Sequence, residues 1–242
     1  MSERISITGF TERPIISECY NEDCAVGMKR LIEKGVKADW LITDPPYGIG
    51  VGSHSYTNGV AMVGKALAKR RDYSGMGGWD NERIDSALFD LMFQISKNQI
   101  IFGGNYYTDI LPATKSWVVW DKRCNNKLRD DFADCELAWC SKGVARVFRY
   151  MNKGMLQGDM KHKDPRFHPT QKPRQIWEQL LDYYTKKGDL IIDPFAGSQS
   201  LRIACHRRRR SYIGFEINKE FFDKGQKWYE QEIAQMDLFD LL

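Results

Sequence analysis

Short apolar runs alternate along this chain with longer segments in which apolar residues recur every three or four positions. The short runs are typical of strands buried on both faces of a sheet, and the longer spacing is typical of amphipathic helices. Strands are expected at residues 38–43, 99–102, 117–120, 190–193 and 212–215, and helices at residues 23–35, 82–97, 173–187, 199–206 and 219–234. Strands that alternate with helices predict an α/β fold with a mostly parallel, doubly wound sheet.

Two segments break this alternation. Residues 135–140 and 144–150 flank a short polar turn and predict an antiparallel hairpin. Residues 50–80 are rich in glycine and basic residues, and a long segment of that composition inside a compact domain predicts a mobile loop. Because the sequence shows no repeat and no low-complexity linker, we expect a single domain over residues 1–242 with a C-terminal tail at 235–242.

Composition narrows the class of protein. The 242 residues are 42% hydrophobic and 12% aromatic, which is ordinary for a chain that buries a core. No run approaches the ~20 apolar residues of a membrane span and the N-terminus is polar, so we expect a cytoplasmic protein without membrane contact. Six cysteines without a Cys-x-x-Cys pair, and only four histidines, predict neither a metal site nor a disulfide framework.

The clearest chemical signal is the hexapeptide at residues 43–48, directly after an apolar strand. It contains Asp44, Pro45, Pro46 and Tyr47. Proline fixes φ at about −65° and donates no backbone N–H, so the carbonyl groups here are expected to point outward. A carboxylate, an outward carbonyl and an aromatic face suit a planar base that bears an exocyclic amine. A plain Pro-Pro turn after a strand is the alternative interpretation.

Three of the expected strands end at an acidic residue. These residues are Asp44, Asp193 and Glu216. Ligands of open parallel sheets bind beyond the carboxyl ends of the strands, so we expect the three carboxylates to lie around one site. Gly197 follows Asp193 where backbone must approach a ligand closely. Glu216 has the position from which a carboxylate can accept both hydroxyls of a ribose.

These segments together resemble the DNA amino-methyltransferases, which transfer a methyl group from S-adenosylmethionine to an exocyclic nitrogen of a base. Residues 44–47 are similar to the family's catalytic tetrapeptide, 193–198 to its cofactor loop, and 168–173 to the box that precedes the cofactor half. The order, with the catalytic box first, resembles the β arrangement of the family. The resemblance implies a Rossmann-like methyltransferase fold, with a catalytic half at about 20–150 and a cofactor half at about 165–234.

The resemblance also implies roles for individual residues. Asp44, Pro45, Pro46 and Tyr47 would bind and orient the target base. The residues expected to hold the S-adenosylmethionine cofactor are Asp23, Cys24, His168, Thr170, Lys172, Asp193, Phe195, Ala196, Gly197, Ser198 and Glu216. Gln199 departs from the family's pattern, which often has glycine there, and a positive φ at this position would be strained.

An aspartate at position 44 resembles the members that methylate adenine more than those that methylate cytosine. We therefore expect a DNA adenine methyltransferase that acts on the 6-amino group of a flipped base. Methylation of the 4-amino group of cytosine is the alternative within the class. A DNA-binding or clamp-associated module that kept the fold without catalysis is the alternative outside it, and methylation of RNA is a third.

Basic residues cluster along the chain although the net charge is only +4. Clustered positive charge suits a polyanion, so we expect contacts to double-stranded DNA from Lys69, Arg70, Arg71, Lys122 and Arg123. Solvated loops are the alternative. The stretch 207–210, four arginines between a helix and a strand, is interpreted as a solvated turn instead of a DNA contact. With no separate recognition domain between the two halves, we expect a short or permissive target sequence.

The C-terminal tail contains Gln235, Leu238 and Phe239. It resembles the short peptide by which bacterial replication and repair proteins bind the sliding clamp. The alternative is a last helical turn that packs its own leucine and phenylalanine onto the domain. A homodimer is a further partner that the sequence leaves open.

Overall fold

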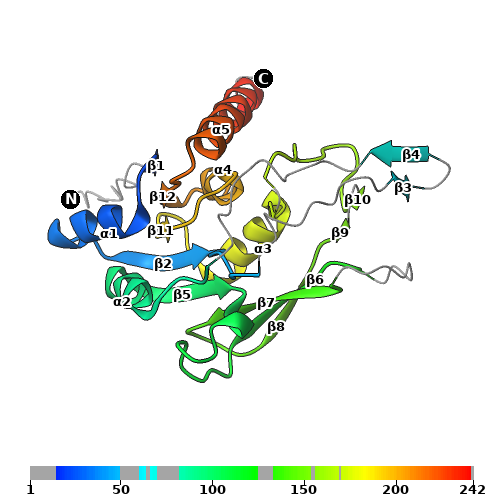
Figure 1. The fold of residues 1–242 in the computed structure, drawn as a ribbon. Helices are drawn as coiled ribbons and strands as arrows, with labels where there is room; N and C mark the ends of the chain where they lie inside the picture. The colour runs from blue at the N-terminus through cyan, green and yellow to red at the C-terminus, as the bar shows by residue number, and fades with distance from the viewer. Residues whose placement is uncertain are drawn as a thin grey trace, which may run out of the picture.

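The computed structural model describes residues 15–49, 60–63, 66–69, 82–124, 133–153, 156–168 and 170–240 (Figure 1). Among these residues one sheet of eight strands has the order β1-β12-β11-β2-β5-β7-β6-β8. Its strands are β1 (Ser17–Tyr20), β2 (Ala38–Thr43), β5 (Ser96–Phe102), β6 (Trp117–Asp121), β7 (Cys135–Cys140), β8 (Arg146–Arg149), β11 (Leu190–Asp193) and β12 (Ser211–Phe215). The helices are α1 (Cys24–Glu33), α2 (Ser86–Ile95), α3 (Arg174–Tyr184), α4 (Ser200–Arg207) and α5 (Lys219–Asp240), with a 3-10 turn, η1 (Gly104–Tyr106).

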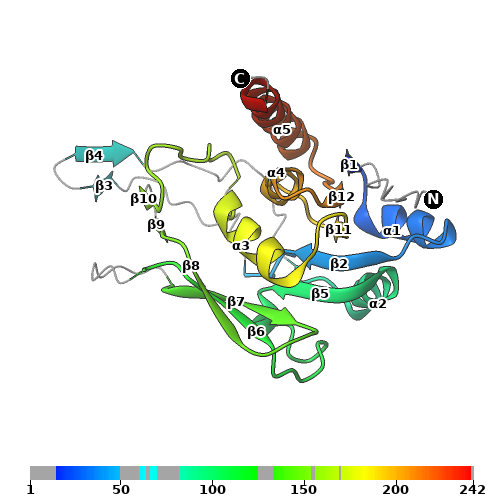
Figure 2. The ribbon, with the colours of Figure 1, turned by 180° about the vertical axis from the view of Figure 1, so that it is seen from behind.

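Five neighbouring strands, β1, β12, β11, β2 and β5, pair in parallel. Their apolar runs are short because both faces of the sheet are covered, and successive residues point to opposite faces. Trp40 and Ile42 of β2 pack in one cluster with side chains of α3 and α4, whereas Leu41 packs with α1 and α2 in the other. The doubly wound arrangement predicted from the sequence is therefore confirmed, and Figures 1 and 2 show it from opposite sides.

The antiparallel part of the sheet differs from the sequence prediction. β7 pairs antiparallel with β5 on one side and with β6 on the other. Both edges of β7 are thus occupied, so β8 cannot form a hairpin with it and instead pairs in parallel with the free edge of β6. The expected hairpin of residues 135–140 with 144–150 is wrong, and the antiparallel neighbours are β6 and β7.

Most other expected elements lie within a few residues of their predicted bounds. β5 begins earlier than expected, because the chain passes directly from the end of α2 into extended backbone at Ser96. β1 was not predicted, since a four-residue edge strand with two polar residues lacks a clear pattern. α5 continues to Asp240 instead of ending near 234, so the helix includes Gln235 and extends into the expected tail.

Two small sheets lie outside the main one. β3 (Val60–Val63) pairs antiparallel with β4 (Ala66–Lys69), inside the segment expected to be a mobile loop. The rest of residues 50–81 lies outside the described residues, and that expectation stays a prediction. β9 (Asn152–Lys153) pairs with β10 (Leu156–Gln157).

The arginines at 207–210 join helices instead of forming only a solvated turn. Arg207 forms an ion pair with Glu232 of α5 at 2.6 Å, and Arg208 forms one with Glu178 of α3 at 2.9 Å. Arg210 is buried and donates to the side chain of Thr185 at 2.8 Å. The interpretation as a solvated turn is wrong for Arg210, because a guanidinium group surrounded by carbonyl and hydroxyl acceptors can be buried with its donors satisfied.

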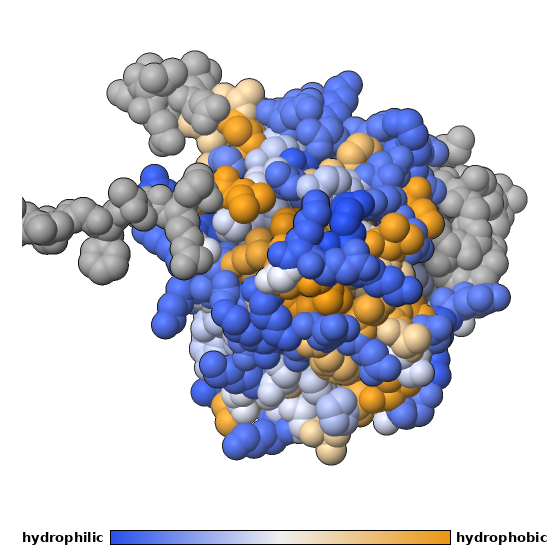
Figure 3. Space-filling view, turned by 90° about the vertical axis from the view of Figure 1, so that its left-hand side faces the viewer, coloured by the Kyte–Doolittle hydropathy of each residue, from blue (hydrophilic) through white to orange (hydrophobic). Residues whose placement is uncertain are grey.

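The face of the molecule in Figure 3 is mostly hydrophilic, with apolar residues gathered near its centre. Within the part of the chain that the structure describes, no helix combines the length and the apolar character that a membrane crossing needs.

Candidate active site

Three acidic residues follow three neighbouring strands at one edge of the sheet. Glu216 follows β12, Asp193 ends β11 and Asp44 follows β2, and these strands are adjacent in the order β12-β11-β2. Thr43, directly before Asp44, donates a hydrogen bond to Asp193 Oδ1 at 2.7 Å. The negative charge of Asp44 also raises the pKa of Asp193, which requires the two carboxylates to be near each other. The structure therefore brings these three predicted residues together.

The segment 44–47 packs against η1 and the residue that follows it. Tyr47 donates a hydrogen bond to Asp44 Oδ1, and Tyr107 donates one to the carbonyl oxygen of Pro46. The ring of Tyr47 stacks on the ring of Tyr106, with centroids 4.9 Å apart and an angle of 17° between the planes. The predicted carboxylate and aromatic face are therefore both present at the end of β2. The carbonyl group of Pro46 is already engaged, which the sequence did not indicate.

Gly103 permits this close packing. Its φ is +65°, and a Cβ atom at this position would lie 2.0 Å from Cε1 of Tyr47. Only glycine combines a left-handed backbone with the absence of a side chain beneath the tyrosine ring. The glycine after β5 is therefore part of the support of Tyr47.

Gly103→Ala is expected to displace Tyr47 and to lower methyl transfer by at least about tenfold, since small misplacements at a reacting centre cost large factors in rate. Gly35→Ala is the matched control, because Gly35 also has a positive φ (+73°) but nothing within 4 Å of a Cβ atom. The left-handed alanine should cost each variant roughly 1–2 kcal/mol of unfolding free energy, and Gly103→Ala should lose more because its Cβ atom overlaps the Tyr47 ring. Thermal unfolding and an initial-rate assay measure the two effects, and equal rates for the two variants would contradict the role given to Gly103.

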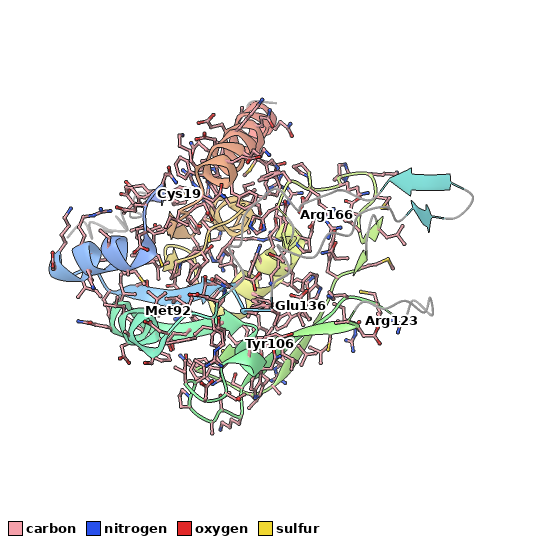
Figure 4. All side chains as sticks on the ribbon, in the orientation of Figure 1. Cys19, Met92, Tyr106, Arg123, Glu136 and Arg166 are labelled. Carbon is pink, nitrogen blue, oxygen red and sulfur yellow. The ribbon has the colours of Figure 1, made fainter. Side chains whose placement is uncertain are left out.

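Lys172 lies at the catalytic segment. Its ammonium group contacts Asp44 Oδ2 and lies 3.2 Å from Glu136 Oε2, and its side chain is 4% exposed. A second ammonium group, Lys122 Nζ, lies 3.0 Å from Glu136 Oε1. Figure 4 shows Glu136 and Tyr106 on the side of the sheet where β2 and β5 end. The sequence grouped Lys172 with the cofactor residues, whereas the contacts described here are to Asp44 and Glu136.

Burial and these ion pairs act on the same groups in opposite directions. Burial raises the pKa of Asp44, and the Lys172 ammonium group lowers it in part. Burial alone would raise the pKa of Glu136, but Lys172 and Lys122 outweigh it and the pKa is lowered. Burial alone would lower the pKa of Lys172, but Asp44 and Glu136 outweigh it and the pKa is raised. Lys172 is therefore a charged group enclosed between two carboxyl groups.

The loop after β11 is closed by Glu216. Gly197 N–H donates to Glu216 Oε2 at 2.8 Å, and Asn218 N–H donates to Oε1 at 2.7 Å. Ala196 N–H donates to the carbonyl group of Phe215 at 2.8 Å, so the loop is also hydrogen-bonded to the last residue of β12. The residue after Glu216, Ile217, is 71% exposed. The Glu216 carboxylate, which can accept further hydrogen bonds, therefore lies beside the exposed side chain of Ile217.

His168 connects the segment 168–173 to this loop. A Cβ atom on Gly197, whose φ is +51°, would lie 3.5 Å from His168 Nε2. Thr170 Oγ1 lies 3.4 Å from His168 Nδ1. Burial, together with the nearby charge of Lys172, lowers the pKa of His168 to about 3, so the imidazole is neutral at physiological pH. The structure therefore places His168 beside Gly197 of the predicted cofactor loop, and Thr170 beside His168.

Gln199 has a positive φ although it is not glycine, which the sequence indicated would be strained. Its φ is +60° and the residue is completely buried. Its side-chain amide donates to the carbonyl group of Phe222 at 3.0 Å, and its oxygen accepts from Arg202 at 2.8 Å. These bonds satisfy the buried amide and compensate for the strain of a non-glycine residue there.

Two further predicted cofactor residues lie at the start of α1. Asp23 is the N-cap, and its Oδ1 accepts hydrogen bonds from the N–H groups of Ala25 and Val26 at 2.9 and 3.1 Å. This capping role satisfies helix donors that would otherwise lack partners. Cys24 is buried, and burial raises the pKa of its thiol to about 12.

Two other predicted cofactor residues lie in the loop after β11. Phe195 is partly buried against the core and Ser198 is buried.

Asp193 has an unusual protonation behaviour for an aspartate. Burial raises its pKa from 3.8 to about 7, although hydrogen bonds from Thr43, Phe195 N–H and Tyr212 favour the ionised form. The folded state therefore holds this proton more tightly than the unfolded state. Stability from this group is fully present below about pH 4 and is lost as the pH rises to about 7.

Asp193→Asn keeps the shape of the side chain without the charge. The Tm of the variant minus the Tm of the wild type should be several degrees larger at about pH 8 than at about pH 5, because the wild type loses stability over this range. Thermal unfolding of both proteins at the two pH values measures this difference. Asp223→Asn, an exposed position on α5, is the control and should show none. The same difference in Tm at both pH values would contradict the expectation.

The predicted DNA contacts are only partly described. Lys122 pairs with Glu136, and Arg123 lies 2.8 Å from Asp134. Lys69 ends β4, and Arg70 and Arg71 lie outside the described residues. Arg123, labelled in Figure 4, follows the carboxyl end of β6, which runs in the same direction as β2 and β5.

Sequence reasoning missed three residues of the site: Tyr106, Glu136 and Ile217. Tyr106 follows the glycine pair after β5, and a cluster of aromatic residues there was its only signal. Glu136 lies in a strand with no motif of its own. Ile217 follows a predicted acid and could have been noticed as an apolar residue outside any element. Within the described ranges, no group of three or more His, Cys, Asp or Glu side chains is arranged to hold a metal ion.

Comparison with known proteins shows which family the chain resembles. The sequence model of the DNA methylase family N6_N4_Mtase matches residues 105–227, about half of the chain. The type II methyltransferase M.HpaI of Haemophilus parainfluenzae is 35% identical over 79 residues, which span 33% of this chain and only 25% of the relative. The methylase YubD of Escherichia coli (strain K12) is 36% identical over 204 residues, which cover 80% of this chain and 82% of YubD.

A solved structure shares the fold. The crystal structure of the M1.HpyAVI–SAM complex superposes with a TM-score of 0.56 over 87% of this chain and 98% of that one, at 20% identity. The family match over half of the chain and the similarity to YubD over most of its length support the same assignment. The chain belongs to the N6/N4 family of DNA methylases.

Proposed function

We propose that this protein transfers a methyl group from S-adenosylmethionine to the 6-amino group of an adenine flipped out of DNA. The observation that carries the proposal is the hydrogen bond of Thr43 to Asp193, at 2.7 Å, which joins the strand of Asp44 to the predicted cofactor loop. A base held at Asp44 and a cofactor held at residues 193–198 would then meet at one edge of the sheet.

The residues around Glu216 fit a nucleoside-bearing cofactor. Each carboxylate oxygen of Glu216 accepts one backbone N–H and keeps capacity for a ribose hydroxyl. Ile217, exposed beside it, offers an apolar surface for a purine. When bound, S-adenosylmethionine supplies a methyl group on a positively charged sulfur, which is already electrophilic.

The chain's own task is to prepare the amine. The lone pair of an exocyclic amine is delocalised into the ring of the base. Asp44 can accept one N–H of the amine and hold the nitrogen so that its lone pair points away from the ring plane, which is positioning together with electrostatic stabilisation. Tyr47, backed by Tyr106, offers a ring face that recovers part of the few kcal/mol spent on flipping the base.

Mass analysis of nucleosides tests the proposal. DNA is incubated with the protein and S-adenosylmethionine carrying a labelled methyl group, and then digested to nucleosides. We expect labelled N6-methyladenine. Labelled N4-methylcytosine would support the alternative base, labelled RNA under the same conditions would support RNA as the substrate, and no labelled nucleoside would overturn the proposal.

Double-stranded DNA is the proposed partner. Lys122 and Arg123 are engaged with Glu136 and Asp134, so a phosphate would have to share or replace a carboxylate at these positions. Basic residues that contact phosphates position a duplex without reading its bases, which supports a short or permissive target sequence.

The C-terminal residues are proposed to bind the sliding clamp. Gln235 would contact the edge of an apolar pocket, and Leu238 and Phe239 would fill it. Because α5 includes these positions, binding would require the last turn of the helix to open or to dock as a helix. A pull-down with the clamp compares the full chain with a chain truncated after Ala234, and with Leu238→Ala/Phe239→Ala as the matched variant. Equal capture of all three proteins would contradict this proposal.

A homodimer is a separate proposal, and gel filtration of the full chain alone tests it.

A further inference from the structure

Four charged side chains from four separate segments form a line of alternating sign. Asp44 follows β2, Lys172 precedes α3, Glu136 lies in β7 and Lys122 follows β6. Lys172 contacts Asp44 and lies 3.2 Å from Glu136, and Lys122 lies 3.0 Å from the other oxygen of Glu136. The ring of Phe102 also lies 4.5 Å from Lys172 Nζ. We propose that Lys172 and Glu136 are positioning residues that set the protonation and the direction of the Asp44 carboxylate.

The need for such a group follows from the environment of Asp44. Its side chain is only 17% exposed, so burial raises the pKa of the carboxyl group and the Lys172 ammonium group acts against that rise. A protonated Asp44 would have one fewer acceptor for the N–H of the target amine, so this inference rests on the proposed function. Lys172 contacts Oδ2 and Tyr47 donates to Oδ1, which fixes the plane of the carboxylate and leaves each oxygen a lone pair for the amine.

Glu136 limits how strongly Lys172 holds Asp44. Its carboxylate shares the ammonium group, so Lys172 is not committed to Asp44 alone. Lys122 in turn neutralises part of the charge of Glu136. Removal of Lys172 and removal of the charge on Glu136 should therefore change Asp44 in opposite directions.

The groups that face this line are few among the described residues. Asp44 is affected by Lys172, Glu136 and Tyr47, and Glu136 is affected by Lys172 and Lys122. Tyr47 is affected in addition by Tyr107, and its pKa is raised well above the usual value by burial and by the two carboxylates. His168, near Lys172, is neutral, and Asp193 lies close enough to be affected by Asp44.

The test measures the pKa of Asp44 directly, by NMR of the ¹³C-labelled carboxyl carbon in the protein without cofactor or DNA. In Lys172→Met we expect this pKa to rise by about one unit or more, since an opposite charge at contact distance lowers a carboxyl pKa by roughly 1–3 units. In Glu136→Gln we expect it to fall by a smaller amount, because Lys172 then pairs with Asp44 alone. The acid limb of the pH profile of kcat should shift in the same two directions.

Two controls separate this effect from general loss of charge. Lys97→Met removes a lysine that pairs with Asp39 at 2.7 Å at the opposite end of the neighbouring strands. Glu178→Gln removes a partly buried glutamate that pairs with Arg208, the C-cap of α4. Neither should change the pKa of Asp44 or the pH profile. A structural role of Lys172 and Glu136 would lower Tm in both variants without opposite shifts.

The outcomes distinguish this inference from the proposed function. If wild-type protein fails to methylate DNA but the two shifts appear, the proposed function fails and the arrangement of charges stands. If wild-type protein methylates DNA and the pKa of Asp44 is unchanged, or moves in the same direction in both variants, the inference is overturned. If Lys172→Met does not fold, Glu136→Gln decides alone, and an unchanged or raised pKa of Asp44 overturns the inference.

Discussion

Asp44→Asn is expected to lower methyl transfer to DNA by roughly 10²- to 10³-fold, the scale at which loss of one preorganised electrostatic partner reduces rates in enzymes. The substitution preserves the shape of the side chain but replaces an acceptor oxygen by an amide that donates. Asp44→Ala should be at least as damaging, since alanine also lacks the one acceptor oxygen that asparagine keeps. Transfer of a labelled methyl group to DNA measures the rate.

Cofactor binding should survive both changes at Asp44. The predicted cofactor loop is held by Glu216 and by backbone hydrogen bonds to β12, which do not involve Asp44. Calorimetric titration with S-adenosylmethionine is expected to give a Kd within about threefold of the wild-type value. Such a change corresponds to less than half of the binding free energy of a tenfold change in Kd. Asp223→Asn on α5 is the control for removal of a carboxylate. Wild-type turnover in either Asp44 variant would remove the mechanism proposed here.

Glu216→Gln should weaken binding of S-adenosylmethionine by about 10- to 100-fold, because hydrogen bonds to a charged group contribute roughly 1.5–3 kcal/mol. The carboxylate accepts Gly197 N–H and Asn218 N–H, so one of these donors would face the amide NH₂ group in the variant. The loop would then lose both a ligand contact and part of its own support. The Kd from calorimetry and the KM for the cofactor should rise together.

The rate at saturating cofactor separates Glu216 from Asp44. We expect kcat of Glu216→Gln to fall less than its KM rises, because Glu216 lies on the cofactor side and does not touch the amine. Glu220→Gln is the matched control. Glu220 lies in the first turn of α5, is exposed, and pairs with Lys224 at 2.5 Å. A Glu216→Gln variant that binds the cofactor like the Glu220→Gln control would contradict the assignment of Glu216.

The sequence predicted the parallel half of the fold well because its signals are local. β2 and β11 are apolar runs bounded by polar residues, and α3 begins after Pro173 with apolar positions at helical spacing. Such patterns depend on burial of one face or both, which the residues themselves record. The acids at strand ends were also predicted correctly, since the carboxyl ends of parallel strands meet at one edge.

The antiparallel half could not be predicted in the same way. Which strand pairs with β8 depends on whether the edges of β7 are free, and that is decided by contacts with β5 and β6 far along the chain. Sequence neighbours such as β7 and β8 are then separated in the sheet. The continuation of α5 past residue 234 was missed because a polar amphipathic helix gives no stop signal before the end of the chain.

By itself the sequence determined the class of fold, the two motifs at residues 44–47 and 193–198, and their place after strands. Only the tertiary structure decided that Lys172 contacts Asp44 instead of serving the cofactor loop alone, that Glu136 and Lys122 complete the line of charges, and that Gly103 supports Tyr47. The physical reason is that an ion pair or a ring contact joins side chains from distant segments. Its partners leave no pattern in the sequence around either residue.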